Sequence, residues 1–167
     1  MSVPPQDIVD YWLGDSVVDA KSALKRHDVW YRGGKDIDDE IAQRFAPQVD
    51  LACQGELVTW ERDVTGALAL VILLDQFTRN LFRGTPKAYS GDNRAWQVAD
   101  RVVKNRAYLN LPVTGQIFLF HPFHHSEVLD EQNRGVMLLE ELRDRVSTAW
   151  TAYVQRSVDG FSGHRDI

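Results

Sequence analysis

The stretch that most constrains the fold of this chain is LALVILLDQFTRNLF, residues 68–82. An apolar run leads, without an intervening Gly or Pro, into four polar residues: Asp75, Gln76, Arg79 and Asn80. When the stretch is placed around a helix at about 100° per residue, apolar side chains cover most of its surface, which is typical of a helix surrounded by other helices. We therefore expect a buried central helix from about Thr65 to Arg83, with its polar residues in the protein interior.

Apolar residues with helical spacing recur along the rest of the chain. The pattern predicts helices over residues 4–13, 36–54, 92–106 and 123–146, then a last helical face before a break at DGFSGHRDI. We expect Pro47 to kink or split the second of these and Pro122 to mark a helix boundary, because proline removes a backbone donor. No run alternates at period two for long enough to form a strand. The sequence therefore predicts an all-α fold.

Length and composition indicate one domain, residues 1–167. A chain of 167 residues that is 44% hydrophobic can bury roughly 70% of its unfolded surface in one core. The net charge of −5 is spread in mixed sign, so we expect no nucleic-acid binding. The longest apolar run ends at Asp75, which excludes a membrane span, and the single Cys53 and the lack of a signal peptide favour the cytoplasm. The oligomeric state stays open.

Asp75 and Arg79 lie one helical turn apart, and apolar residues flank them on the predicted central helix. An unpaired charge in such surroundings is costly. We therefore expect the two residues to pair with each other or with another buried group. A core ion pair is the simplest interpretation of this motif by itself, with Gln76 and Asn80 lining the adjoining edge of the helix.

A second polar cluster is HPFHHSEVLDEQ, residues 121–132, expected at the start of a helix, where anions are favoured. It holds His121, His124, His125, Ser126, Glu127, Glu131 and Gln132. Three interpretations compete: a metal site, a catalytic His125 oriented by a carboxylate, and a helix start capped by Ser126 and Glu127. Because Pro122 displaces His121 and adjacent histidines point apart, no zinc signature is formed. We expect no metal or other cofactor, and a metal-assisted hydrolase is the weaker alternative.

Several motifs carry a family resemblance: LLDQFTRNLFRGTPKAYSGD and FLFHPFHHSEVLDEQ, with YWLGD, VWYRGG, GELVTW and HRDI elsewhere. Together they resemble the bacterial family catalogued as domain of unknown function 924. The resemblance implies a single-domain array of packed helix hairpins of the tetratricopeptide-like superhelical type, and it implies no reaction. The matching polar positions are Asp75, Gln76, Arg79, Asn80, Arg83, Asp92, His125, Ser126, Glu127 and Gln132.

The chain also departs from the family pattern. Thr78 stands where the family usually has proline, which predicts a straighter helix. The family pattern continues beyond Ile167 into a segment rich in Arg, Phe and His, so we expect an open pocket or one that a partner completes.

The matched polar residues together predict one pocket for a small anionic ligand. In this hypothesis Arg79 and Arg83 hold a carboxylate or phosphate, Gln76 and Asn80 orient the ligand, and His125 and Glu127 carry protons. Asp75 and Gln132 complete the ligand-binding set. The alternative is a helical scaffold that binds a protein or peptide segment, in which these residues only hold the helices in register.

Overall fold

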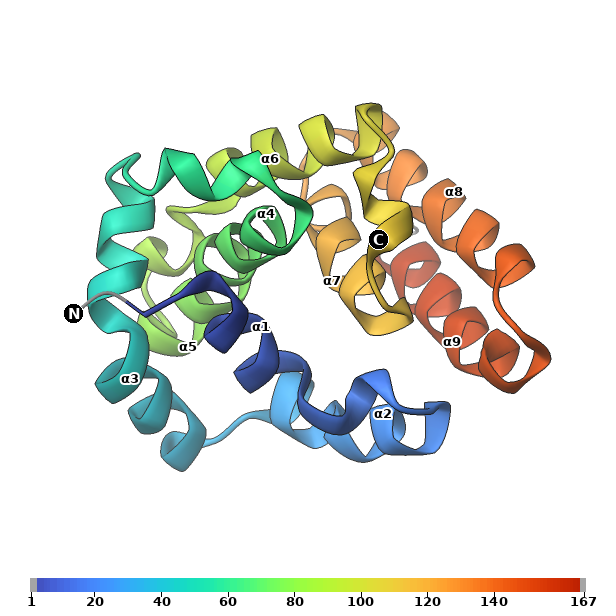
Figure 1. Cartoon of the computed structure of the whole chain (residues 1–167), viewed down its shortest axis with the longest axis horizontal. Helices are drawn as coiled ribbons and strands as arrows, with labels where there is room; N and C mark the ends of the chain where they lie inside the picture. Colours follow the sequence, from blue (N-terminus) through green and yellow to red (C-terminus); the bar gives the residue numbers. More distant parts are fainter. Residues whose placement is uncertain (1–2, 166–167) are drawn as a thin grey trace.

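The computed structural model describes residues 3–165, and within this range every regular element is helical (Figure 1). The helices are α1 (Pro5–Leu13), α2 (Ala20–His27), α3 (Lys35–Cys53), α4 (Val64–Val71), α5 (Thr78–Leu81), α6 (Asp92–Lys104), α7 (Val113–His124), α8 (Leu129–Arg145) and α9 (Thr148–Arg165). Short 3-10 turns and two π-helical segments, Asp28–Arg32 and Ile72–Phe77, join some of them. The predicted all-α fold is confirmed. The side chains of the HRDI motif, residues 164–167, lie outside the described residues.

The expected central helix is present as one continuous helical segment, residues 64–81, which we call the central rod. α4 passes through the π-helical segment into α5, and the side chains from Ala67 to Thr78 are all buried. The rod contacts α1, α3, α6 and α7, and Figure 1 shows it in the middle of the molecule, between α3 and α7. This burial places Asp75 and Gln76 in the interior, as the apolar stretch around them predicts.

The middle of this rod has π-helical rather than α-helical geometry. The sequence predicts a straighter helix at Thr78 than proline would give, and the chain does stay helical there. Thr78 Oγ1 donates a hydrogen bond of 2.8 Å to the carbonyl oxygen of Leu74. A π-helical turn widens the backbone locally and is frequent at functional sites. Asp75, within this segment, contacts His125 at the end of α7.

Neither interior proline ends its helix. α3 runs unbroken through Pro47, so the expected split is wrong. Pro47 and Gln43 are exposed, and water can bind the Gln43 carbonyl that loses its partner. Pro122 likewise lies inside α7, which corrects the predicted boundary, because burial of Ile117 to Phe120 and of Phe123 outweighs the local preference of proline.

The Pro122 correction changes the setting of the histidines. His121 and His124 lie in the last turn of α7, and His125 is its C-cap residue. The predicted helix start at HHSE is therefore wrong, since α8 begins only at Leu129. A helix C-terminus carries partial negative charge, so α7 does not supply the anion-favouring end that the sequence suggested.

α8 and α9 form an antiparallel hairpin beside α7 (Figure 1). α9 continues through DGFSG without interruption, so the predicted break at residues 159–163 is wrong. Phe161 explains the continuation, since its ring stacks on His124 with a centroid distance of 4.2 Å and ties this turn to α7. No helix among the described residues is both long and apolar enough to cross a membrane.

Candidate functional site

The candidate site is built on a contact between the π-helical segment and the end of α7. His125 Nδ1 lies 2.8 Å from Asp75 Oδ1. The Asp75 side chain is completely buried, whereas the His125 side chain is 20% exposed. The two residues therefore form a carboxylate–histidine pair with the carboxylate below the surface and the imidazole at it. Such a pair fixes both the orientation and the tautomer of the ring.

Asp75 is held as a carboxylate in spite of its burial. Burial by itself raises its pKa, but the charge and hydrogen bond of His125, helped by the charge of Arg79, outweigh this effect and lower the pKa to about 2. Gln76 Nε2 donates to the second oxygen, Oδ2, at 2.7 Å. With both oxygens engaged, Asp75 accepts a hydrogen bond from Nδ1–H of His125, which makes Nε2 the unprotonated ring nitrogen whenever the imidazole is neutral.

The main partner of Arg79 is Asp92, and its contact with the Asp75 carboxylate is longer. Its two terminal nitrogens donate to the two Asp92 oxygens at 2.8 and 3.0 Å, whereas its nearest approach to Asp75 Oδ1 is 3.8 Å. Arg79 Nη1 also donates to the Asp75 backbone carbonyl. Asp92 begins α6, so this bidentate pair joins the central rod to the start of that helix. The expectation that Arg79 and Asp75 meet a buried partner is confirmed, and most of the pairing crosses between helices.

A pocket of about 970 Å³ lies over this arrangement. Its wall is formed by the starts of α6 and α8, the end of α7 and the turn between α7 and α8. The lining residues are Arg79, Tyr89, Asp92, Asn93, Trp96, Pro122, His125, Ser126, Glu127, Val128, Glu131 and Gln132. The volume falls in the range of small-molecule sites.

Glu127 and Gln132, expected at the site from the sequence, both line this pocket. Glu127 is exposed, and Gln132 is half-buried. Gln132 Nε2 donates to the Ser126 carbonyl at 2.7 Å, and Ser126 Oγ accepts from the Val128 backbone N–H at 3.1 Å. These bonds hold the connection between α7 and α8 in shape and engage the amide nitrogen of Gln132.

Asn80 and Arg83, the other expected ligand-binding residues, lie elsewhere. Arg83 donates from Nε and Nη2 to the two Asp38 oxygens, each at 3.0 Å, and Asn80 Nδ2 donates to Asp38 Oδ1 at 2.9 Å. Asp38 belongs to the first turn of α3, so this group ties α3 to the end of the central rod. Neither residue lines the pocket, and the buried Asp75 and Gln76, also expected to bind the ligand, are not among its lining residues. The polar residues expected in one pocket thus divide into two groups.

Several pocket residues escaped the sequence analysis. Tyr89 and Trp96 line the pocket but were not expected there from the sequence, and Glu131 was named only as a member of the second polar cluster. Trp96 Nε1 donates to Glu131 Oε2 at 3.0 Å. Its ring is only half-buried. The spacing of apolar residues alone does not distinguish such a half-buried side chain from one in the core.

The histidine cluster has no metal-binding arrangement within the described part of the chain, where no three His, Cys, Asp or Glu side chains converge suitably. His121 instead stacks on Phe118 with a centroid distance of 4.7 Å. Its Nδ1 donates to the Ile117 carbonyl at 2.9 Å, and its Nε2 accepts from the Tyr31 hydroxyl at 3.2 Å. His121 is 4% exposed, and its contacts are those of a buried packing residue.

We expect acidification to lower the free energy of unfolding, because the buried neutral His121 resists protonation in the folded protein. Burial lowers the pKa of His121 from 6.5 to about 4. Between these values the unfolded chain binds more protons than the folded one, so the free energy of unfolding falls as pH decreases through this window. Urea unfolding measured across the window should show a shallower decline for His121→Phe than for the native protein.

Asp75 does not confound this comparison, because its contribution is lost at lower pH, as pH falls from 3.8 toward its folded pKa of about 2. Equal slopes for His121→Phe and the native protein above pH 4 would contradict the assignment of a buried neutral His121.

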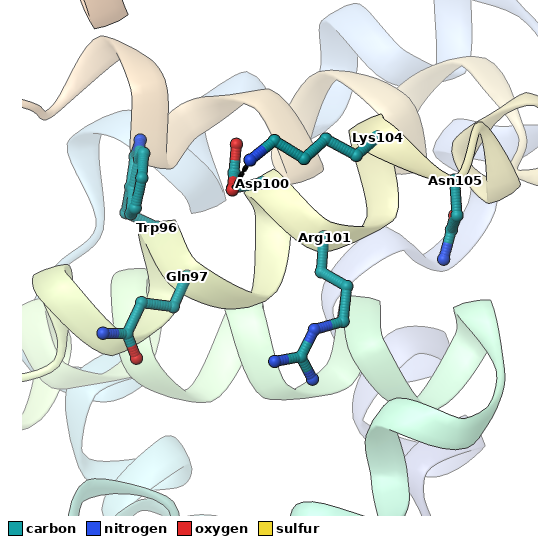
Figure 2. A pocket seen from close by; sticks show the side chains of 6 residues that line it. All are labelled: Trp96, Gln97, Asp100, Arg101, Lys104 and Asn105. Atoms are coloured by element: carbon teal, nitrogen blue, oxygen red, sulfur yellow. Dashed lines mark ion pairs between the residues drawn. The ribbon is translucent and has the colours of Figure 1, made fainter.

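A second hollow, of about 660 Å³, lies on the outer side of α6. Figure 2 shows its side chains, all from α6 and the adjoining Asn105, with Lys104 reaching over to Asp100 and Arg101 extending toward the opposite side. The charges are already paired within the chain: Asp100 with Lys104 and Arg134, and Arg101 with Glu61. A single helix face with neutralised charges gives little for a ligand to bind, so the pocket above Asp75 is the candidate site.

Comparison with known proteins agrees with this picture of the fold. A family model described as "Bacterial protein of unknown function (DUF924)" matches residues 8–167. A solved structure of a protein of unknown function from Agrobacterium tumefaciens is similar, with a TM-score of 0.73 and 28% sequence identity, over 95% of this chain and 82% of that chain. No protein with a curated description matches. Both the family model and the similar solved structure are described as of unknown function.

Proposed function

This chain belongs to the bacterial family of unknown function DUF924, and from that premise we propose that it binds a small molecule in the pocket above Asp75. The proposal rests on one observation: a buried, ionised Asp75 holds His125 by Nδ1 at 2.8 Å, and His125 lines a pocket of about 970 Å³. A buried ion pair is often no more stabilising than well-packed apolar residues of similar volume, so stability alone does not account for a charged pair at this place. A pocket that orients a histidine in this way suits recognition or proton transfer.

In the proposed complex, His125 Nε2 faces the bound molecule. No described residue donates a hydrogen bond to this nitrogen. In the neutral imidazole the proton stays on Nδ1, which donates it to the Asp75 carboxylate, so Nε2 accepts a hydrogen bond or a proton from the ligand. Glu127 lies on the next turn of chain and is a second acceptor. If the ligand reacts, these two groups are the ones placed to carry its proton.

We expect a thermal-shift screen of small metabolites to find compounds that stabilise the native protein but not His125→Gln. A ligand bound only by the folded state raises the free energy of unfolding through mass action, by about 3 kcal/mol at a hundredfold excess over its Kd, and the melting temperature rises with it. Glutamine keeps the size and polarity of His125 but lacks its ring geometry. The change therefore removes the ligand's partner with little effect on packing.

Arg83→Gln is the matched control, because Arg83 is another polar position that matches the family pattern but contacts Asp38 outside the pocket. Ligand-induced stabilisation should persist in this variant. Loss of stabilisation in Arg83→Gln together with its retention in His125→Gln would place the ligand elsewhere and overturn the proposal.

We further propose that the helices stack in the tetratricopeptide-like manner implied by the family resemblance and that the protein acts in the bacterial cytoplasm. The pairing of α7 with α8 and of α8 with α9 supports the first point, since neighbouring antiparallel hairpins are the unit of such arrays. Cys53 supports the second: it is an exposed free thiol, which a reducing compartment tolerates.

A further inference from the structure

We propose that the ligand carries a positively charged amine joined to an apolar body. This inference rests on the proposed function, since it concerns the chemistry of the same pocket. It differs from the anion expected from the sequence. The argument depends on which polar groups of the pocket remain free once the protein's own contacts are counted.

The two arginines that an anion would need are already engaged. Arg79 gives both terminal nitrogens to Asp92 and also donates to the Asp75 carbonyl. Arg83 gives its donors to Asp38 and does not line the pocket. An incoming carboxylate or phosphate would have to displace Asp92 from a bidentate pair, which is the strongest form of the arginine–carboxylate contact.

The acids of the pocket outnumber its cations. Arg79 is the one guanidinium or ammonium group that lines it, against the three carboxylates of Asp92, Glu127 and Glu131. Arg134 reaches Glu131 from outside at 3.3 Å, and Asp92 is paired with Arg79. Glu127 forms no ion pair with a described residue, so no described cation compensates its negative charge in the pocket lining.

The helix starts beside the pocket do not reverse this balance. α6 and α8 each direct an N-terminus, with its partial positive charge, toward the pocket. Asp92 lies in the first turn of α6, and Glu131 lies in the first turn of α8. These two carboxylates already compensate the positive ends, so an anion would gain little from them.

The groups left for a ligand are mainly hydrogen-bond acceptors. His125, Glu127 and Gln132 all line the pocket, and each has an acceptor to which no described residue donates: Nε2 of the neutral imidazole, the carboxylate, and the side-chain carbonyl oxygen of Gln132, whose amide nitrogen is bound to Ser126. Three acceptors in one pocket match an ammonium group, which has three donors and no acceptor. The ligand end that meets them is therefore a donor, and the free charge of Glu127 favours a cationic one.

The remaining wall of the pocket is apolar and aromatic. Tyr89, Trp96, Pro122 and Val128 line it, and Tyr89 and Val128 are 62% and 57% exposed. Arg79 already lies over the Tyr89 ring at 5.3 Å from its centroid, which shows that this wall accepts a cation over an aromatic face. An amine with a hydrocarbon body would cover these side chains and bring its charge to Glu127.

A matched set of three probes tests this inference: phenethylamine, phenethyl alcohol and hydrocinnamate, which share a phenethyl body and end in a cation, a neutral hydroxyl and an anion. In NMR titrations of the native protein at neutral pH, we expect phenethylamine to bind most tightly and to shift the signals of pocket residues. Tightest binding by hydrocinnamate would overturn the cation inference but leave the ligand pocket standing. Absence of any binding by all three would overturn this inference, while the screen with His125→Gln would still judge the pocket itself.

The charge variant Glu127→Gln should weaken phenethylamine binding at least about threefold, as expected for one partly solvated ion pair, and should leave phenethyl alcohol unchanged. Glu56→Gln, which alters the net charge equally at an exposed position outside the pocket, is the control and should have no effect. Equal weakening by both variants would show a general charge effect and overturn the role of Glu127. A short blocked lysine peptide, tested beside phenethylamine, shows whether the amine is a free molecule or a protein side chain.

Discussion

Replacing Gly91 with alanine is expected to lower the free energy of unfolding by about 3 kcal/mol, at the upper end of the cost of overpacking, and the melting temperature by about 10 °C. A Cβ atom at this position would lie 2.2 Å from the backbone carbonyl oxygen of Leu74. Unlike the end of a side chain, this oxygen cannot rotate away, because it belongs to the π-helical segment and accepts the hydroxyl of Thr78. The start of α6 must therefore move outward.

Gly160→Ala is the matched control. Gly160 lies within α9, and an added Cβ would meet nothing within 4 Å. Alanine there should stabilise the helix by about 0.5–1 kcal/mol, because it loses less backbone entropy than glycine. Thermal or urea unfolding of both variants gives the comparison. If Gly91→Ala were as stable as the native protein, α6 could not lie as close to the central rod as the structure places it.

The second large effect is expected at Arg79. Arg79→Met should destabilise the protein by about 3 kcal/mol, near the lower end of the range for a broken buried pair. It leaves the Asp92 carboxylate without its bidentate partner, in a place where burial already raises the Asp92 pKa. The Arg79 and Asp92 side chains are only 24% and 27% exposed, so water compensates the stranded charge poorly.

Arg83→Met provides the comparison, since Arg83 makes the same kind of bidentate contact with Asp38. The Arg83 side chain is 57% exposed, and Asp38, itself 20% exposed, keeps its hydrogen bond from Asn80 when Arg83 is replaced. The expected loss there is within about 1 kcal/mol, as for other solvated pairs. Urea unfolding of the two variants, with Arg79→Met combined with Asp92→Leu as a rescue, measures the difference. Equal losses at Arg79 and Arg83 would mean that burial does not set the strength of these pairs.

Part of the site was predictable from local pattern. The apolar residues around Asp75 cover most sides of their helix, so burial of that carboxylate and its need for a partner follow from the sequence. The partner, His125, was also a candidate residue, as a member of the second polar cluster. Their contact was not predictable, because it joins positions fifty residues apart and depends on how α7 packs against the rod.

The prolines show where local pattern was misleading. Because proline lacks a backbone donor, Pro122 suggested a helix boundary, and HHSE was therefore expected at the start of a helix. The buried apolar residues on both sides of Pro122 keep α7 helical through it, because their burial outweighs one lost hydrogen bond. The histidines therefore meet the pocket from the end of a helix rather than from its beginning.

The sequence by itself determined the helical class of the protein, its buried central rod and the need to neutralise the charges on that rod. These properties depend on the periodicity and polarity of neighbouring residues, which the chain carries wherever it is placed. Only the tertiary structure decided which charges meet: Asp75 with His125, Arg79 with Asp92, and Arg83 with Asp38. Each carboxylate has several cationic groups in the sequence as possible partners, and helix packing selects among them because it sets which side chains come within hydrogen-bond distance.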